Sequence, residues 1–404
     1  MHTPASSPAA PTRSPWPQVL IVLAAGVLSA CQVGKAPVAL GQVRADLGLD
    51  LDSASWLLSA FAVVGVLFGA SAGRLVDRFG ARQLAIAGLA LQALASAAGA
   101  AADDGTSLLA SRAAEGLGFL AVIVACPTLI QACCGGGDST RAFAAWSTFM
   151  PVGITLVSVA GPLLGPLGWR GFWWLNATVL VVGALALYAG TRRLDTLPPG
   201  PAIPRRAGLA AVLRSPSARM LGILFAAYTA CYFAVFGFLP TVLAARGAIG
   251  EGTAGILVGI AVAAGAIGNL AGGSLLARGR SPAAVLVAAF VVLGTSAMLA
   301  LHDTLPFGVS YMACIVFSGV GGLIPTTLFA LAPRSAPSPA LVGTTMGWLV
   351  QGNNLGLMLG PALAGFTAGR LGWGTVGLGV AALAFCSGWA AWRRSPHADA
   401  LRLR

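Results

Sequence analysis

The chain has 404 residues, of which 57% are apolar and only 9% are charged, and its mean hydropathy is +0.84. A soluble domain needs roughly 25% charged residues to cover its surface, so this composition excludes a cytosolic enzyme, a nucleic-acid-binding protein and a disordered chain. The formal net charge of +12 therefore needs an explanation other than a nucleic-acid partner.

Long stretches without Asp, Glu, Lys or Arg predict membrane-spanning helices. A bilayer core is about 30 Å thick, so a spanning helix needs roughly 20 apolar residues, whereas barrel strands alternate polar and apolar residues over about ten positions. Twelve such stretches cover residues 14–34, 53–73, 83–102, 116–137, 142–169, 171–191, 220–245, 252–277, 281–302, 304–333, 335–369 and 371–392. We predict an all-α integral membrane protein of twelve transmembrane helices, arranged as two six-helix repeats.

The even division of the spans predicts the domains. They are a cytoplasmic tail (1–17), an N-terminal six-helix bundle (18–191), a cytoplasmic linker (192–218), a C-terminal six-helix bundle (219–393) and a second cytoplasmic tail (394–404). The first apolar run is longer than a signal-peptide core, and we expect it to remain as the first span.

The distribution of arginine predicts the orientation. If both termini are cytoplasmic, 18 arginines lie on the cytoplasmic side and four on the other side, as the positive-inside rule requires. The net charge is thus a topology signal of a multi-pass protein of the bacterial cytoplasmic (inner) membrane. The basic central linker could also contact anionic membrane lipid.

No enzyme or metal signature accompanies the spans. The sequence has no Ser/His/Asp set, nucleotide-binding loop or H-E-x-x-H motif. Its seven cysteines lie in or at the ends of predicted spans, without a C-x-x-C pair. We expect no catalytic residues, cofactor, metal site or disulfide framework.

Three sequence marks recur at an offset of about 200 residues. They are segments 73–78 and 273–278, the Gly-Pro pairs at 161–162 and 360–361, and the prolines at 127 and 325. Duplicated halves of six spans are typical of secondary transporters, whose substrate site lies near the midplane between the halves.

Three motifs carry a resemblance to a known family. Residues 73–82 (GRLVDRFGAR) resemble the G-x-L-a-D-r-x-G-r-k loop of the major facilitator superfamily, with Ala81 at one basic position. Residues 112–118 (RAAEGLG) are similar to the R-x-x-x-G-x-G stretch of the family. Residues 161–176 (GPLLGPLGWRGFWWLN) resemble the G-P-x-x-G-G element and the following W-R-x-x-F-x-x-N of drug/proton antiporters, with Pro166 replacing the second glycine.

The resemblance implies a gating role for the first loop, which in this family bridges to the other half and closes the cytoplasmic side. The residues that would carry this role are Gly73, Asp77, Arg78, Gly80 and Arg82. The alternative is that the arginines of the loop only set the topology.

Charged residues within spans are costly and default to functional candidates. Here they are Lys35, Arg112 and Glu115, and Gln32 shares a helix face with Lys35. Two cations and one carboxylate would make a cavity positive, which suits an anionic substrate, and Glu115 would be the proton carrier. As alternatives, Lys35 snorkels to the outer interface, Arg112 and Glu115 form a structural i,i+3 pair, or the substrate itself carries the proton.

Tyr228, Tyr232 and Asn353 are further candidates for substrate contact, because the resemblance places their helices near the cavity. Polar residues in spans also join helices by hydrogen bonds, which is the alternative for each. The pairs Gly161–Pro162 and Gly360–Pro361 should kink the fifth and eleventh spans.

We therefore expect a secondary active transporter that moves a small molecule, best a small organic anion, by alternating access as a monomer, with or without proton coupling. A proton-coupled multidrug or toxic-compound efflux antiporter is the alternative, and a transport-dead receptor is a third reading.

Overall fold

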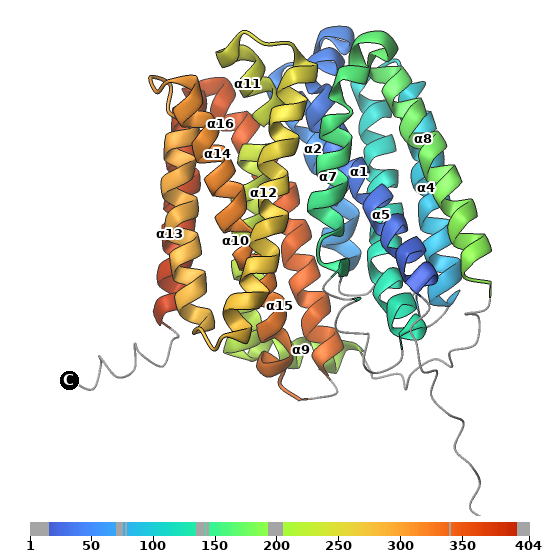
Figure 1. The fold of residues 1–404 in the computed structure, drawn as a ribbon, viewed down its shortest axis with the longest axis vertical. Helices are drawn as coiled ribbons and strands as arrows, with labels where there is room; N and C mark the ends of the chain where they lie inside the picture. The colour runs from blue at the N-terminus through green and yellow to red at the C-terminus, as the bar shows by residue number, and fades with distance from the viewer. Residues whose placement is uncertain are drawn as a thin grey trace, which may run out of the picture.

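The computed structural model describes residues 16–69, 76, 79–134, 142, 145–192, 205–338 and 341–393. Figure 1 shows two groups of helices side by side, the N-terminal group in blue and green and the C-terminal group in yellow to red. The helix α1 begins and α16 ends at the lower end of Figure 1, which we call the terminal end. The all-α fold predicted from the sequence is confirmed for the described residues, which contain no strand.

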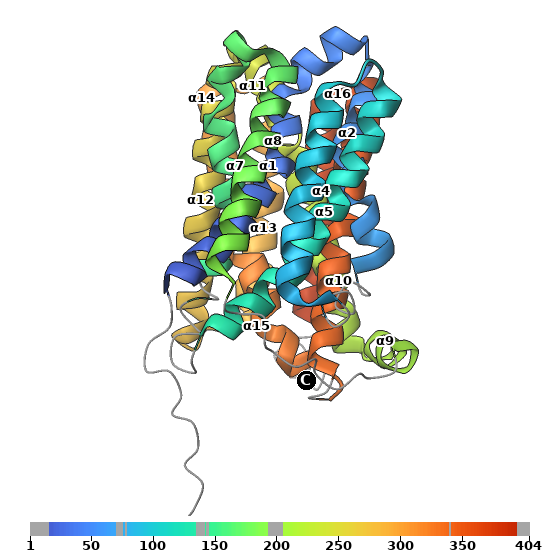
Figure 2. The ribbon, with the colours of Figure 1, turned by 90° about the vertical axis from the view of Figure 1, so that its right-hand side faces the viewer.

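The N-terminal half consists of α1 (Trp16–Leu47), α2 (Leu51–Phe68), α4 (Ala81–Ala100), α5 (Gly105–Cys133), α7 (Phe149–Val159) and α8 (Leu164–Gly190). The short helix α9 (Arg205–Arg214) lies within the predicted linker, across the terminal end of the C-terminal half (Figure 2). The C-terminal half consists of α10 (Pro216–Phe236), α11 (Leu239–Gly247), α12 (Glu251–Ala277), α13 (Pro282–Leu301), α14 (Phe307–Gly321), α15 (Leu323–Ser335) and α16 (Val342–Arg393).

Among the described residues, ten helical segments are long and apolar enough to cross a membrane. Two of them, Phe149–Gly190 and Val342–Arg393, have 42 and 52 residues, far more than the roughly 20 that one crossing needs. Each contains one sharp turn, at Gly168 (φ 63°) and Gly372 (φ 80°). Counted as two crossings each, they agree with the twelve predicted spans.

These turns correct two predicted breaks, the one between spans five and six and the one between spans eleven and twelve. The sequence places the first break at Arg170, because a charged residue marks it, whereas the helix turns at Gly168 and resumes at Trp169. The sequence places the second break at Arg370, whereas the turn is at Gly372. Glycine is needed there because positive φ is unfavourable for residues with a Cβ atom. The tripeptide Leu-Gly-Trp occurs at both turns, at residues 167–169 and 371–373.

Backbone geometry repeats between the two halves. Six described residues have positive φ, and they form three pairs separated by about 200 positions: Gly48 with Ala248, Gly80 with Gly279, and Gly168 with Gly372. A duplicated backbone therefore underlies the sequence repeat.

The two halves meet along two helix pairs, α2 with α16 and α7 with α12. Gln351 donates a hydrogen bond to the carbonyl of Val66 (2.9 Å), and Arg370 pairs with Asp52 (2.8 Å) at the end opposite the terminal end. On the other pair, a Cβ atom at Gly255 would lie 2.8 Å from the carbonyl oxygen of Ser158, so only glycine permits this approach.

Candidate functional site

The ammonium of Lys35 lies inside the N-terminal half. The Lys35 side chain is 0% exposed, and its Nζ donates to Ser96 Oγ on α4 (2.7 Å) and to Glu115 Oε1 on α5 (2.5 Å). Nζ also lies 4.7 Å from the ring centroid of Trp173 on α8. The snorkelling alternative is therefore wrong for this structure, because the side chain points between helices rather than toward an interface.

Arg112 holds the other oxygen of Glu115. Its Nη1 bonds Glu115 Oε2 and donates to the carbonyl of Gln32 (2.9 Å), while Nε donates to the carbonyl of Leu57 (3.2 Å). The guanidinium lies 4.7 Å from the ring centroid of Phe61. The i,i+3 pair expected from the sequence exists, but Lys35 joins it, so the pair is part of a larger cluster.

We call Lys35, Arg112 and Glu115 the charge cluster. Their side chains are 0%, 1% and 0% exposed. With all three groups ionised, the cluster carries a net charge of +1 that water does not screen, because no face of it is open to solvent. Such a charge acts over a longer distance than one at the surface.

Gln32 supports the cluster with an incomplete hydrogen-bond set. Its Nε2 donates to Asn176 Oδ1 on α8 (3.3 Å) and its main-chain carbonyl accepts from Arg112. Its Oε1, although buried, accepts no hydrogen bond from the described residues. A buried polar atom without a partner carries a desolvation cost, and this one lies beside the charges.

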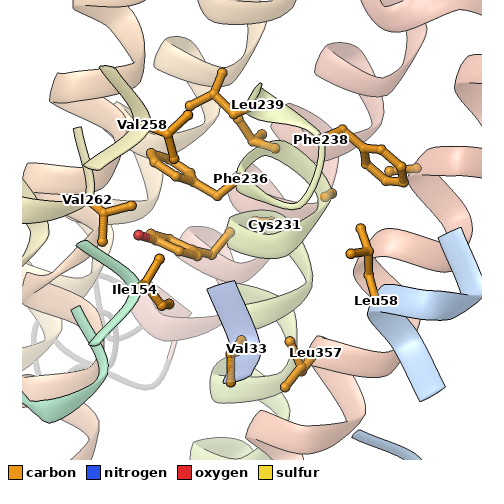
Figure 3. Packing of buried hydrophobic residues seen from close by; sticks show 14 of the residues in the cluster. Val33, Leu58, Ile154, Cys231, Phe236, Phe238, Leu239, Val258, Val262 and Leu357 are labelled. Atoms are coloured by element: carbon orange, nitrogen blue, oxygen red, sulfur yellow. The ribbon is translucent and has the colours of Figure 1, made fainter. Parts of the chain in front are cut away.

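Apolar side chains separate the charge cluster from the C-terminal half. Figure 3 shows Val33 of α1 and Ile154 of α7 in one buried cluster with Cys231 and Phe236 of α10 and Leu357 of α16. A narrow void beneath Arg112 and Trp173, lined mainly by aliphatic side chains, is too small to hold a water molecule. In this structure the cluster is closed both to the other half and to solvent.

An aromatic group lies on α10, inside the C-terminal half. The rings of Tyr228 and Tyr232 are 5.9 Å apart, Tyr232 stacks on Phe236 at 4.6 Å, and its hydroxyl lies 3.4 Å from Ser318 Oγ of α14. Tyr228 is half-buried, and its hydroxyl has no hydrogen-bond partner among the described residues.

Asn353 lies on α16 beside α10. It accepts a hydrogen bond from Thr229 through Oδ1 (2.9 Å), and it is half-buried. The structure thus collects the sequence candidates into two groups. Lys35, Arg112, Glu115 and Gln32 lie together in the N-terminal half, and the two tyrosines and Asn353 lie in the other half.

The predicted gating loop is described only in part, since Gly73, Asp77 and Arg78 lie outside the described residues. Gly80 has φ 78° and precedes α4. Arg82 donates to Thr191 Oγ1 (3.1 Å) and to the carbonyl of Tyr188 (2.9 Å), both near the end of α8. These contacts lie within the N-terminal half, so a bridge to the other half stays a prediction.

The Gly-Pro pairs behave differently from each other. Gly161 and Pro162 begin a short 3-10 turn after α7, which interrupts the predicted fifth span. Around Gly360 and Pro361 the helical dihedral angles continue, and the non-helical residue of α16 is Gly372. The expected kink at the second pair remains a prediction.

Three partners of the candidate residues were not singled out as candidates from the sequence: Ser96, Trp173 and Asn176. Hydroxyl, indole and amide side chains are common in spans and do not reveal which face of a helix they occupy. The one available signal was Asn176, which closes the W-R-x-x-F-x-x-N element and now proves to contact Gln32.

Comparisons with known proteins agree on one family. Residues 22–350 match the family described as Major Facilitator Superfamily. The chain is 28% identical over 360 residues to the 3-(3-hydroxy-phenyl)propionate transporter of Escherichia coli (strain K12), covering 85% of this chain and 84% of the relative. It is 29% identical over 380 residues to the chloramphenicol resistance protein of Streptomyces lividans, covering 88% of this chain and 91% of the relative.

Solved structures share the fold at low identity. A mutant of the nucleoside transporter NupG superimposes with a TM-score of 0.74 at 17% identity, over 93% of this chain and 99% of that chain. A bacterial homologue of the human lysosomal transporter Spinster, inward-facing and occupied, gives a TM-score of 0.74 at 13% identity, over 93% and 96%.

Proposed function

The chain belongs to the Major Facilitator Superfamily, and from that premise we propose that it moves a small organic anion across the bacterial cytoplasmic membrane by alternating access. That it is a multi-pass membrane transporter of small molecules follows from the family. The sign of the substrate charge and the coupling are the proposal.

The net charge of the buried cluster is the observation that supports an anion. Two cations share one carboxylate inside the N-terminal half, without solvent. At an effective dielectric constant near 20, a unit charge about 10 Å away gains or loses about 1.7 kcal/mol, roughly 20-fold in affinity. An anion between the halves is attracted by this amount without touching the cluster, and a cation is repelled by it.

The C-terminal half supports an apolar, ring-bearing substrate. Tyr228 offers a half-buried ring with a hydroxyl that has no partner among the described residues, and Asn353 on α16 offers an amide bonded to Thr229, the next residue of α10. Aromatic rings stack on aromatic substrates at favourable geometry. The name of the Escherichia coli relative joins a hydroxyphenyl ring to a carboxylate. In this proposal the aromatic group on α10 would contact such a ring, and the charge cluster would attract the carboxylate.

Alternating access would proceed by rocking of the two halves about their symmetric contacts. The apolar layer at Val33, Ile154 and Leu357 would part on one side while the ion pair between Asp52 and Arg370 keeps the other side closed. In this proposal the terminal end is cytoplasmic and carries both termini.

Export of a drug by a proton-coupled antiporter is the second candidate. It is favoured by the resistance protein of Streptomyces lividans, which matches 88% of this chain, and by the aromatic group on α10, which contains no charged side chain. A neutral drug would be indifferent to the buried charge, whereas a cationic drug would be repelled.

Thermal unfolding of the purified protein with a panel of compounds tests the proposal. A ligand at about 100 times its Kd stabilises the folded state by about 2.7 kcal/mol. We expect arylalkanoates to raise the unfolding temperature more than the matching aryl alcohols. The difference should shrink in Lys35→Met but not in Arg280→Gln, whose arginine is exposed in the connection between α12 and α13. Stabilisation by cationic dyes alone would overturn the anion assignment.

A further inference from the structure

Gaining a proton at Glu115 and losing one at Lys35 have different electrostatic costs in the charge cluster. Glu115 accepts a hydrogen bond from Lys35 on Oε1 and one from Arg112 on Oε2, so each of its carboxylate oxygens is bound to a cation. Protonating Glu115 would leave two adjacent buried cations without a counter-charge, and the cluster would carry +2. Removing one partner of a buried ion pair is strongly unfavourable for this reason.

Loss of a proton from Lys35 has the opposite effect on the charge. The Arg112–Glu115 pair would remain, with a net charge of zero, and arginine does not release its proton in proteins. The neutral amine could still donate to Glu115 and could accept from the hydroxyl of Ser96, which now donates to the carbonyl of Trp173 (2.9 Å). The geometry around Nζ therefore accommodates both forms.

The titratable and charged side chains around Lys35 come from α1 and α5. On α1 the titratable neighbour is Cys31, whose Sγ donates to the carbonyl of Gly153 (3.3 Å). On α5 the charged neighbours are Arg112 and Glu115. In the described part of α4 and α8, the groups that contact Nζ are Ser96 and the ring of Trp173, neither of which is charged.

We propose that Lys35, and not Glu115, releases and regains the proton during transport, and that it is protonated when an organic anion is bound. The Nζ–H bond breaks, nitrogen keeps the electron pair, and the proton passes to water on the side to which the cluster opens. With Lys35 protonated, the cluster (+1) and a bound anion (−1) sum to zero. With Lys35 neutral and no anion bound, the net charge is also zero. This inference rests on the proposed function and makes the transporter a proton–anion symporter.

Reciprocal coupling follows from the same charge balance. If the proton strengthens anion binding, the anion must strengthen proton binding by the same factor. A cationic substrate would instead compete with the proton, which gives antiport. The charge of the substrate thus determines the direction of coupling in this cluster.

Lys35 is the one lysine of the chain, so it can be observed alone. The full chain, labelled with 15N- and 13C-lysine and reconstituted in lipid nanodiscs, should give one side-chain Nζ signal that Lys35→Arg removes. Without an anion, we expect this signal to change from ammonium to amine between the acidic and the alkaline ends of the range in which the protein stays folded. Added 3-phenylpropionate at the alkaline end should restore the ammonium signal.

A signal that stays at the ammonium position under all conditions overturns the inference, and so does a pH-dependent signal that the anion does not shift although the anion binds. If no anion stabilises the protein, the proposed function fails instead, and the signal measured without an anion still reports whether Lys35 changes its charge.

Transport supplies the second readout. With the membrane potential clamped at zero, wild-type proteoliposomes should accumulate the anion up to about tenfold for each unit of imposed pH difference. Lys35→Arg keeps a fixed positive charge and should lose this gradient-driven accumulation, whereas Arg280→Gln should keep it. Equal accumulation by Lys35→Arg and the wild type would assign the proton to another group.

Discussion

Substitution of Glu115 should be far more damaging than substitution of Lys35, although the two residues form one ion pair. The wild-type cluster carries +1, Lys35→Met leaves the neutral pair of Arg112 and Glu115, and Glu115→Gln leaves two cations with a charge of +2. Two charges about 5 Å apart at an effective dielectric constant near 20 repel by about 3 kcal/mol. Breaking a buried pair by removing one partner typically costs about 3–5 kcal/mol.

We expect Glu115→Gln to lower the free energy of unfolding by about 3–5 kcal/mol, because it leaves uncompensated buried cations. Lys35→Met should lower it by less, because the Arg112–Glu115 pair that remains is neutral. The double variant should lie between them, since one cation is removed together with the carboxylate. The measurement is thermal unfolding of the purified protein in detergent, with Asp103→Asn as a control at an exposed carboxylate. Equal loss in Lys35→Met and Glu115→Gln would refute the charge count.

Three further predictions concern the contacts between and within the halves. Asp52→Asn removes the half-exposed ion pair with Arg370, worth about 0–1 kcal/mol, and should shift the population toward opening at that end by up to about fivefold, read from distances between spin labels on α2 and α16. Gly116→Ala should destabilise the protein by about 1–3 kcal/mol in thermal unfolding, because a Cβ atom there overlaps a carbonyl of α2, whereas Gly343→Ala meets open space. The carboxyl of Asp104 accepts a backbone hydrogen bond from the first turn of α5, which holds its pKa below the usual value. Its contribution to folding is therefore complete at neutral pH and lost as the pH falls through the folded pKa, and a pH-unfolding series should show a smaller acid-side loss in Asp104→Asn.

The spans could be predicted because charge is expensive in lipid. Runs without charged residues locate almost every helix, and the same rule singled out Lys35, Arg112 and Glu115. It failed at Gly168, since a turn between two spans depends on backbone geometry, while the nearest charge, Arg170, lies two residues later. The repeated Leu-Gly-Trp tripeptide was the signal that could have located both turns.

The composition of the site could be predicted only in part. The i,i+3 spacing of Arg112 and Glu115 is a local property, so the sequence indicates that they can pair. The contact between Lys35 and Glu115 joins residues 80 positions apart, and no spacing rule determines which way Lys35 points. Whether the cluster faces a cavity or the interior of one half depends on how α4 and α8 pack, because Ser96 of α4 and Trp173 of α8 contact Lys35 Nζ.

Uptake of an arylalkanoate into proteoliposomes tests the central claim most directly, namely that a buried positive cluster makes this transporter select anions. Our account predicts saturable accumulation of the carboxylate that follows an imposed proton gradient, with little uptake of an amine of the same size. Proton-driven movement of the amine, without transport of the carboxylate, would contradict it.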